Sequence, residues 1–445
     1  VIVLTANVVH AAEYQRDENV APGSVKEDLD SIEIESEERI RLLPKLGDWK
    51  KGLPEFWSES SLTPHFRSYG FSRRFSDDED PEAIALGGEI RYLSGMLKDV
   101  FRIGASYYIS HGIHDDGGDG TLLLGSNASD LSVLGQLHLE AQIKGFRLRL
   151  YRQAFNLPYL NKNDSRMIPI THEAYVVRRT DDRLEFIAGQ VTDIKRRDSE
   201  SFISMAEAAG VGDPDRAGQE GDLGSDDNDS DRGTSMAGLR YRLSDSSSVG
   251  VINYYTWDTF NIFYSDFHFL KEWNEEIVSR FSGQFTHQKS IGDELIGAFN
   301  ANHYGVRVRT SYKNAILTLA TTNTGSGAPI QSPFGGRPSY LSLMRSDFDS
   351  ANEVGFLVGL SYDFSRLGLP DLSAFANVAW GNNAEDTSTK ENLPDETEYD
   401  FTVDYRPKSG ALNGLWLRLR YAYLDIGDGE DTQDVRVTVN YKLPF

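Results

Sequence analysis

The sequence contains no cysteine in its 445 residues. Disulfide scaffolds, thiolate metal sites and cysteine nucleophiles are therefore excluded. Long hydrophobic runs are also missing, since no apolar stretch reaches the length of about 18 residues that a membrane-spanning helix requires. Basic residues are scarce relative to acidic ones, 45 against 68, which gives a net charge of -23. This excess of negative charge repels phosphate backbones and disfavours nucleic acid as a partner.

Aromatic residues and glycine are plentiful, with 23 Phe, 21 Tyr and 40 Gly, although hydrophobic residues make up only 39% of the chain. Two fold classes fit this composition: a soluble β protein and a transmembrane β-barrel. The strands of such a barrel alternate polar and apolar residues, so each gives only a weak hydropathy signal.

The N-terminal region differs from the rest of the chain. Residues 1–12, VIVLTANVVHAA, resemble the second half of a secretory signal peptide, with cleavage expected after Ala11. A short buried strand is the alternative interpretation. Residues 13–58 are expected to form a polar, acidic extension, and residues 59–445 to form the main domain.

The last eleven residues alternate strictly between apolar and polar side chains, which predicts a strand with one face of each kind. The apolar face comprises Val435, Val437, Val439, Tyr441, Leu443 and Phe445. A terminal aromatic residue is typical of the signature by which outer-membrane barrels are recognised for assembly. The barrel-assembly machinery is therefore an expected partner, through Phe445.

Similar alternation predicts about eighteen strands in all. They are expected at 62–73, 84–94, 100–110, 131–142, 145–154, 172–178, 183–190, 235–243, 248–257, 264–272, 277–287, 302–312, 314–322, 353–364, 372–380, 398–406, 415–424 and 435–445. Short connections, such as 144–145, alternate with long polar ones, which include 111–130, 155–171, 191–234, 323–352 and 381–397. This pattern predicts an all-β fold: a single transmembrane antiparallel β-barrel with short periplasmic turns and long extracellular loops. Eighteen strands enclose a channel.

Basic residues recur on the polar face of these strands. The inward positions expected to line the pore include Arg102, Arg147, Arg149, Arg307, Arg309, Arg418, Arg420 and Arg436. A row of guanidinium groups in a narrow channel attracts and guides anions. The alternative is that these arginines only neutralise Asp and Glu across the interior, and Glu89 and Glu140 are inward by the same parity.

Four segments resemble the OprD family of substrate-specific outer-membrane porins, and the resemblance runs from about residue 60 to the C-terminus. They are Leu157–Pro169 with its Asn-Asp-x-Arg-x-x-Pro pattern, the aromatic Tyr254–Tyr264, Ser332–Phe334 followed by Ser339-Tyr340, and Tyr362–Leu372. The resemblance implies an 18-stranded monomeric barrel whose third and seventh loops fold inward to form a constriction. It also implies diffusion of small solutes that usually bear a carboxylate.

The family pattern also implies roles for individual residues. Asp164 and Arg166 would lie at or near the constriction with Ser165 beside them, and Tyr264 would contribute an aromatic wall. Arg418 and Arg420 would belong to a basic ladder. The long N-terminal extension and the acidic loop at 198–234 depart from the pattern and weaken the assignment of carboxylates as substrates.

Catalysis and metal binding have little support in the sequence. No Gly-x-Ser-x-Gly motif occurs, so we expect no enzyme and no cofactor. His111, His114, Asp115 and Asp116 lie close together, but a solvated loop is the simpler interpretation, and we expect no metal site.

Three functions remain open, in the outer membrane of a Gram-negative bacterium among its lipids and lipopolysaccharide. The first is passive, selective diffusion of small organic anions. The second is a channel for sugars or oligosaccharides, which would stack on Trp416, Tyr108 and Tyr151. The third is a structural or adhesion barrel plugged by residues 13–58. The sequence does not distinguish a monomer from a weak trimer.

Overall fold

The computed structural model describes residues 52–75, 80–116, 121–211 and 232–443. Nineteen strands form a single sheet, and all of them except the two-residue β8 (Ile203–Ser204) make the wall of a barrel. The eighteen wall strands are β1 (Ser61–Phe75), β2 (Glu82–Leu93), β3 (Phe101–Asp116), β4 (Leu131–Ile143), β5 (Phe146–Gln153), β6 (Thr171–Thr180), β7 (Leu184–Lys195), β9 (Thr234–Ser244), β10 (Ser247–Thr256), β11 (Phe260–Glu272), β12 (Ile277–Ser290), β13 (Asn300–Tyr312), β14 (Ala315–Thr324), β15 (Val354–Asp363), β16 (Leu372–Asn382), β17 (Glu396–Tyr405), β18 (Leu415–Ile426) and β19 (Thr432–Lys442).

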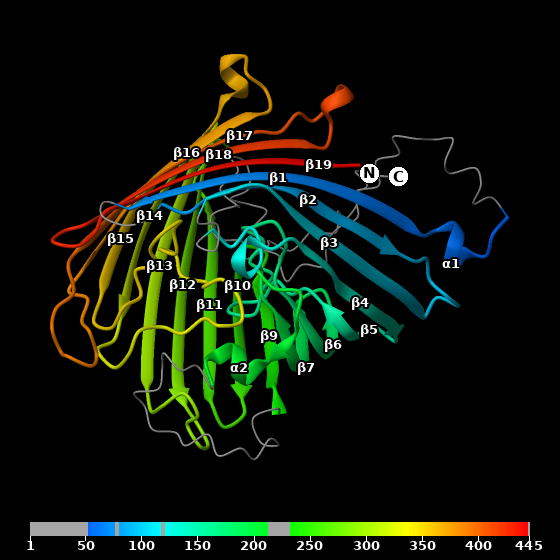
Figure 1. The fold of residues 1–445 in the computed structure, drawn as a ribbon, viewed down its shortest axis with the longest axis horizontal. Helices are drawn as coiled ribbons and strands as arrows, with labels where there is room; N and C mark the ends of the chain where they lie inside the picture. Colours follow the sequence, from blue (N-terminus) through cyan, green and yellow to red (C-terminus); the bar gives the residue numbers. More distant parts are fainter. Residues whose placement is uncertain (1–51, 76–79, 117–120, 212–231, 444–445) are drawn as a thin grey trace.

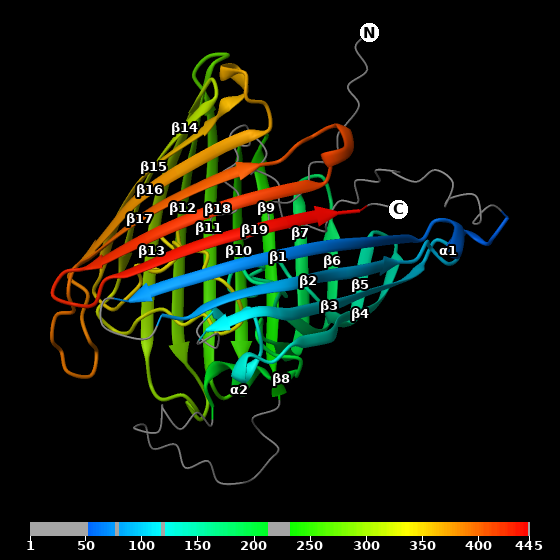
Figure 2. The ribbon, with the colours of Figure 1, turned by 45° about the horizontal axis from the view of Figure 1, so that its top comes forward.

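The sheet closes on itself because the first and last strands pair. β1 is antiparallel to β2 on one side and to β19 on the other, where Arg67 lies opposite Asn440 and Phe71 opposite Arg436. Every other wall strand pairs with its neighbours in chain order. Figures 1 and 2 show the resulting barrel, with blue β1 beside red β19. The sequence prediction of a closed antiparallel barrel of about eighteen strands is confirmed.

The two faces of the wall follow the alternation in the sequence. On β18, Leu417 and Leu419 are 37% and 45% exposed, whereas Arg418 and Arg420, one residue along, are 4% and 5% exposed. Pairing inside a sheet satisfies the backbone groups, so a closed wall can present apolar side chains to hydrocarbon. The polar side chains then point to the interior.

Connections at the two ends of the barrel differ in length. One end has short turns such as 144–145, 181–183, 245–246 and 313–314; we call it the turn end. The other, the loop end, has the connections at 76–81, 117–130, 154–170, 196–233, 291–299, 325–353 and 383–395. Two connections at the loop end are also short, 257–259 and 427–431. The first is short because β11 begins at Phe260, four residues before the expected start at 264. Phe260 is already paired with Ser290 of β12.

Helical segments are few and short in the described part of the chain. Pattern reading of the strands did not anticipate α1 (Glu55–Ser58) or α2 (Met205–Ala209), which lies in the loop after β7. None of the described helices is long and apolar enough to cross a membrane. The expectations for residues 1–12, for Phe445 and for nearly all of residues 13–58 lie outside the described residues.

Candidate functional site

Two loops fold into the barrel and divide its interior. The third connection at the loop end, residues 154–170, is called L3 here, and the seventh, residues 325–353, is called L7. Both are largely buried: Leu160 and Ile168 of L3 and Leu341 of L7 are 0% exposed. An apolar cluster joins the two loops to the inward faces of β10 and β11. These loops therefore occupy part of the barrel interior and pack against one side of its wall.

A wall arginine holds the centre of L3. Arg67 of β1 donates from both Nη atoms to the Asp164 carboxylate, at 2.6 and 3.2 Å, and from Nη1 to the Arg166 carbonyl at 2.5 Å. Burial opposes ionisation of Asp164, but the Arg67 guanidinium outweighs it and keeps the pKa of Asp164 below its ordinary value. Arg67 was missed by the sequence analysis, although its inward parity on β1 was a usable signal.

The side chains of Arg166 and Ser165 turn toward neighbouring loops. The Arg166 guanidinium donates to the carbonyls of Thr121 and Ser165, at 2.8 Å each, and lies 5.2 Å from the centre of the Phe71 ring. The Ser165 hydroxyl accepts from Arg197 at 2.6 Å. Both residues therefore hold L3 against the connections after β3 and β7.

Arginines on β18 and β19 lie on the inward face, where each of two is paired with an acid. Arg418 donates to both carboxylate oxygens of Asp404 at 2.8 Å. Arg436 pairs with Asp434 at 2.5 Å and also donates to the Met344 carbonyl of L7 at 3.1 Å. Arg420 is opposite Arg436 in the register of the two strands.

Another group of arginines surrounds a single carboxylate on β4. Glu140, which is 0% exposed, lies 2.8 Å from Arg102, 2.8 Å from Arg149 and 3.5 Å from Arg147. One carboxylate balances only one of these three guanidinium groups. This part of the wall therefore carries an excess of positive charge.

The remaining predicted residues lie on the opposite wall. Arg307 of β13 places its guanidinium 4.4 Å from the centre of the Tyr340 ring of L7. Arg309 is opposite Arg280 of β12. Tyr264 is 1% exposed and packs edge to face against Tyr159 of L3, 6.1 Å between ring centres. Tyr264 therefore supports L3 from the wall of the barrel.

An acidic face on β17 was not anticipated. Its inward residues alternate with outward Tyr399 and Phe401, a period-two signal that the sequence analysis applied to Glu89 and Glu140 but not to this strand. They are Glu396, Glu398, Asp400 and Asp404. Glu398 accepts from the backbone N–H groups of Arg345 and Ser346 in L7, at 2.8 and 2.7 Å. The acidic face thus binds L7 as well as Arg418 of β18.

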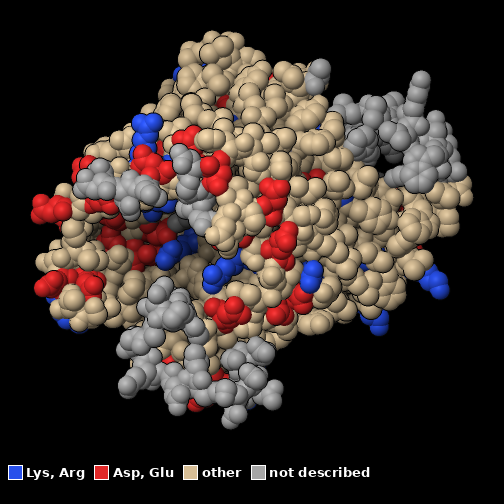
Figure 3. Space-filling model, in the orientation of Figure 1, with Lys and Arg blue, Asp and Glu red and all other residues tan. Residues whose placement is uncertain are grey.

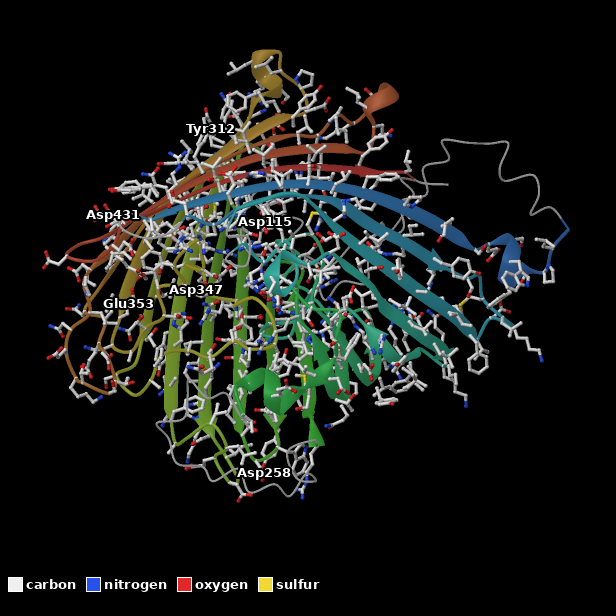
Figure 4. All side chains as sticks on the ribbon, in the orientation of Figure 1. Asp115, Asp258, Tyr312, Asp347, Glu353 and Asp431 are labelled. Atoms are coloured by element: carbon white, nitrogen blue, oxygen red, sulfur yellow. The ribbon has the colours of Figure 1, made fainter. Side chains whose placement is uncertain are left out.

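The stem of L7 carries further charged residues. Arg337 pairs with both Asp347 and Asp349, which raise the pKa of its guanidinium above the ordinary value although burial opposes this. Burial, with Glu396 and Asp349 nearby, raises the pKa of Glu353 to about 8. Figure 4 places Glu353 and Asp347 at the left of the view, where Figure 3 shows acidic side chains gathered in a hollow.

The histidines expected in a solvated loop lie near the end of β3. His111 pairs with Asp130 across the connection to β4 and is well exposed. Among the residues that the structure describes, no group of three or more His, Asp or Glu side chains is arranged to hold a metal ion.

Comparisons with known proteins agree on one family. The model of the outer membrane porin, OprD family, matches residues 54–445. None of the curated proteins matches the sequence. Among solved structures, Pseudomonas aeruginosa OccK9 (OpdG) is similar with a TM-score of 0.77 and 21% identity, over 88% of this chain and 100% of that one.

Two further solved structures show the same fold. Acinetobacter baumannii OccAB1 has a TM-score of 0.76 and 17% identity, over 89% of this chain and 99% of its own. Pseudomonas aeruginosa OpdK with vanillate has a TM-score of 0.73 and 19% identity, over 88% of this chain and 100% of its own.

Proposed function

Because the chain belongs to the OprD family of outer membrane porins, we propose that it is a passive channel selective for small organic solutes that bear a carboxylate. The family and the closed barrel are those of a channel rather than an enzyme. They imply the outer membrane of a Gram-negative bacterium, where lipid and lipopolysaccharide would surround the wall. The finer proposal concerns which solutes pass.

The excess of arginine around Glu140 is the observation that carries this proposal. Arg102, Arg147 and Arg149 face one carboxylate, so an anion in the lumen meets positive charge that the protein itself does not neutralise. Guanidinium groups bind carboxylates through paired hydrogen bonds. The relative solved with vanillate, a carboxylate, supports the same class of solute.

Passage also requires that no site holds the solute too tightly. Acids partly neutralise the arginines of β18 and β19, as in the Arg418–Asp404 and Arg436–Asp434 pairs. A solute carboxylate would compete with Asp404 for Arg418 and would be released when the pair re-forms. Alternating pairs of this kind favour brief contacts over a deep binding site.

Reconstituted channels test the proposal directly. We expect the protein to be anion-selective in a planar bilayer with a salt gradient, and liposomes to swell faster in organic acids than in sugars of similar size. Arg147→Gln with Arg149→Gln should reduce both preferences, because Glu140 then keeps only Arg102. Arg74→Gln, an exposed arginine on the outward face of β1, is the matched control.

Cation selectivity in the wild type, or unchanged selectivity in the double variant, would refute this assignment. Faster swelling in sugars would favour the sugar channel. Two of its expected stacking residues already have other contacts. The guanidinium carbons of Arg406 and Arg418 lie 3.9 and 4.7 Å from the centre of the Trp416 ring. Tyr108 is 3% exposed, and its hydroxyl accepts from Gln136 at 2.6 Å. Conductance that appears only after deletion of residues 13–58 would favour the plugged barrel.

A further inference from the structure

The Asn161 side chain of L3 is hydrogen-bonded to the backbone of L7. Asn161 of L3 is 1% exposed. Its amide nitrogen donates to the Gly336 carbonyl of L7 at 2.8 Å, and its amide oxygen accepts from the Gly336 N–H at 2.8 Å. The same amide also donates to Leu157 O at 3.2 Å and accepts from Asn163 N at 3.1 Å, both within L3. The side chain therefore closes its own loop and pairs with the backbone of the other.

The approach of the two backbones at this point requires a glycine in L7. A Cβ atom at Gly335 would lie 2.6 Å from the Asn161 nitrogen and 2.8 Å from its amide oxygen. The contact with the backbone nitrogen cannot be relieved by rotating a side chain, and the Asn161 amide is held by its own hydrogen bonds. Any larger residue at position 335 must therefore push L7 away from L3.

Both loops are also anchored to the wall beside this contact. The Gln288 side chain of β12 pairs with the backbone of Gln331, donating at 2.7 Å and accepting at 2.8 Å. Phe334 stacks on Phe260 of β11, 5.9 Å between ring centres. On the L3 side, the Tyr159 hydroxyl is bonded to that of Thr286 at 2.8 Å. The wall therefore holds each loop, and the Asn161–Gly336 contact joins the two loops to each other.

We propose that Asn161 is the positioning residue that fixes the separation of L3 and L7, and with it the width and the solute size limit of the channel. An amide is needed because it both donates to and accepts from one peptide group. A carboxylate would lose the donor and repel the Gly336 carbonyl, and an alanine would leave buried backbone groups unpaired. The proposal deepens the channel function above but does not depend on the charge of the solute.

Four variants test it by single-channel recording and by liposome swelling with uncharged polymers of graded size. Asn161→Ala and Gly335→Ala act from opposite loops, and each should raise the open-channel current noise and shift the size limit upward. The double variant should differ little from either single one, because both break the same contact. Asn161→Asp, nearly the same size as the native residue, should act as Asn161→Ala does.

Asn261→Ala is the matched control, since Asn261 exchanges amide hydrogen bonds with Asn253 on the outward face of two adjacent wall strands. Folding is checked by the faster migration of the unheated barrel in detergent gels. Folded Asn161 variants with wild-type noise and size limit, or additive effects in the double variant, would overturn the proposal. If Asn161→Ala does not fold, the noise and size limit of Asn161→Asp and Gly335→Ala test the proposal by the same criteria. If the wild type is not anion-selective, the proposed substrate class is refuted, but the proposed role of Asn161 is unaffected.

Discussion

At the scale of single residues, the parity of a strand predicts where a side chain points but not which partner it finds. Arg102, Arg149 and Arg418 all face inward, as their positions in the sequence indicated. Their acids lie on neighbouring strands, and only the register between strands decides whether Glu140 meets one arginine or three. Asp404 and Glu398 were missed for the same reason, since their significance depends on what β18 and L7 bring to them.

Glu353 links residue chemistry to the pH dependence of stability. Its carboxyl group has a pKa of about 8 in the folded barrel, raised by burial and by Glu396, whereas an exposed glutamate titrates near its ordinary value of 4.5. Between these two values the folded state binds more protons than the unfolded state. Stability should therefore fall as the pH rises from about 4.5 to about 8.

Glu353→Gln should remove this loss, because the neutral amide resembles the protonated carboxyl group and can still accept from the Ser350 N–H. We expect the free energy of unfolding of the variant to exceed that of the wild type at pH 9 by up to about 4 kcal/mol and to equal it near pH 4. The urea midpoint of unfolding at the two pH values measures this. Glu275→Gln, at an exposed position in the turn between β11 and β12, serves as control; an equal gain there would contradict the role of Glu353.

At the scale of elements, the wall was predictable and the inward loops were not. Period-two patterns located all eighteen wall strands because each must be apolar on one face and paired on both edges. L3 and L7 carry no such repeat. Their course depends on contacts with distant strands, such as Tyr159 with Thr286 and Gln331 with Gln288. Only the family resemblance indicated that these loops fold inward.

The pairing of β1 with β2 depends on a glycine that pattern reading does not reveal. Gly88 has φ +134°, and a Cβ atom there would lie 1.9 Å from the His65 carbonyl oxygen of β1. Gly88→Ala should therefore separate β1 from β2 and destabilise the barrel by more than about 3 kcal/mol. Gly70→Ala, on β1 with only an ordinary contact to Ile84 at 3.9 Å, is the control. The refolding yield and the urea midpoint of unfolding measure the difference between the two variants. Equal values for both would refute the role of Gly88.

At the scale of the whole molecule, charge is distributed unevenly along the axis of the barrel. Glu353, Glu396 and Glu398 lie at the loop end, where β17 begins. Arg147 and Arg149 follow directly after the turn at 144–145, and Arg309 precedes the turn at 313–314, so these cations lie toward the turn end. A group of acids thus lies at the loop end, and arginines outnumber acids toward the turn end. Neither the charge total nor the strand pattern gives this order; it follows from the direction of each strand.

A pore with opposite charges at its two ends should conduct unequally in the two directions. When the loop side is positive, cations enter from the acidic end and anions from the basic end, and both accumulate inside. With the opposite polarity both are depleted, so the current should be smaller. Current–voltage curves of channels inserted in one orientation should show this asymmetry at low salt. It should nearly vanish at 1 M salt, where the screening length is only about 3 Å.

Arg147→Gln with Arg149→Gln weakens the basic end and should reduce the asymmetry, whereas Arg74→Gln, on the outward face of β1, should leave it unchanged. A symmetric curve at low salt, or an asymmetry that persists at 1 M, would show that the ends of the pore do not act through their charge. The current would then be controlled by the shape of L3 and L7, and the variants at Asn161 would alter the asymmetry where the arginine variants do not.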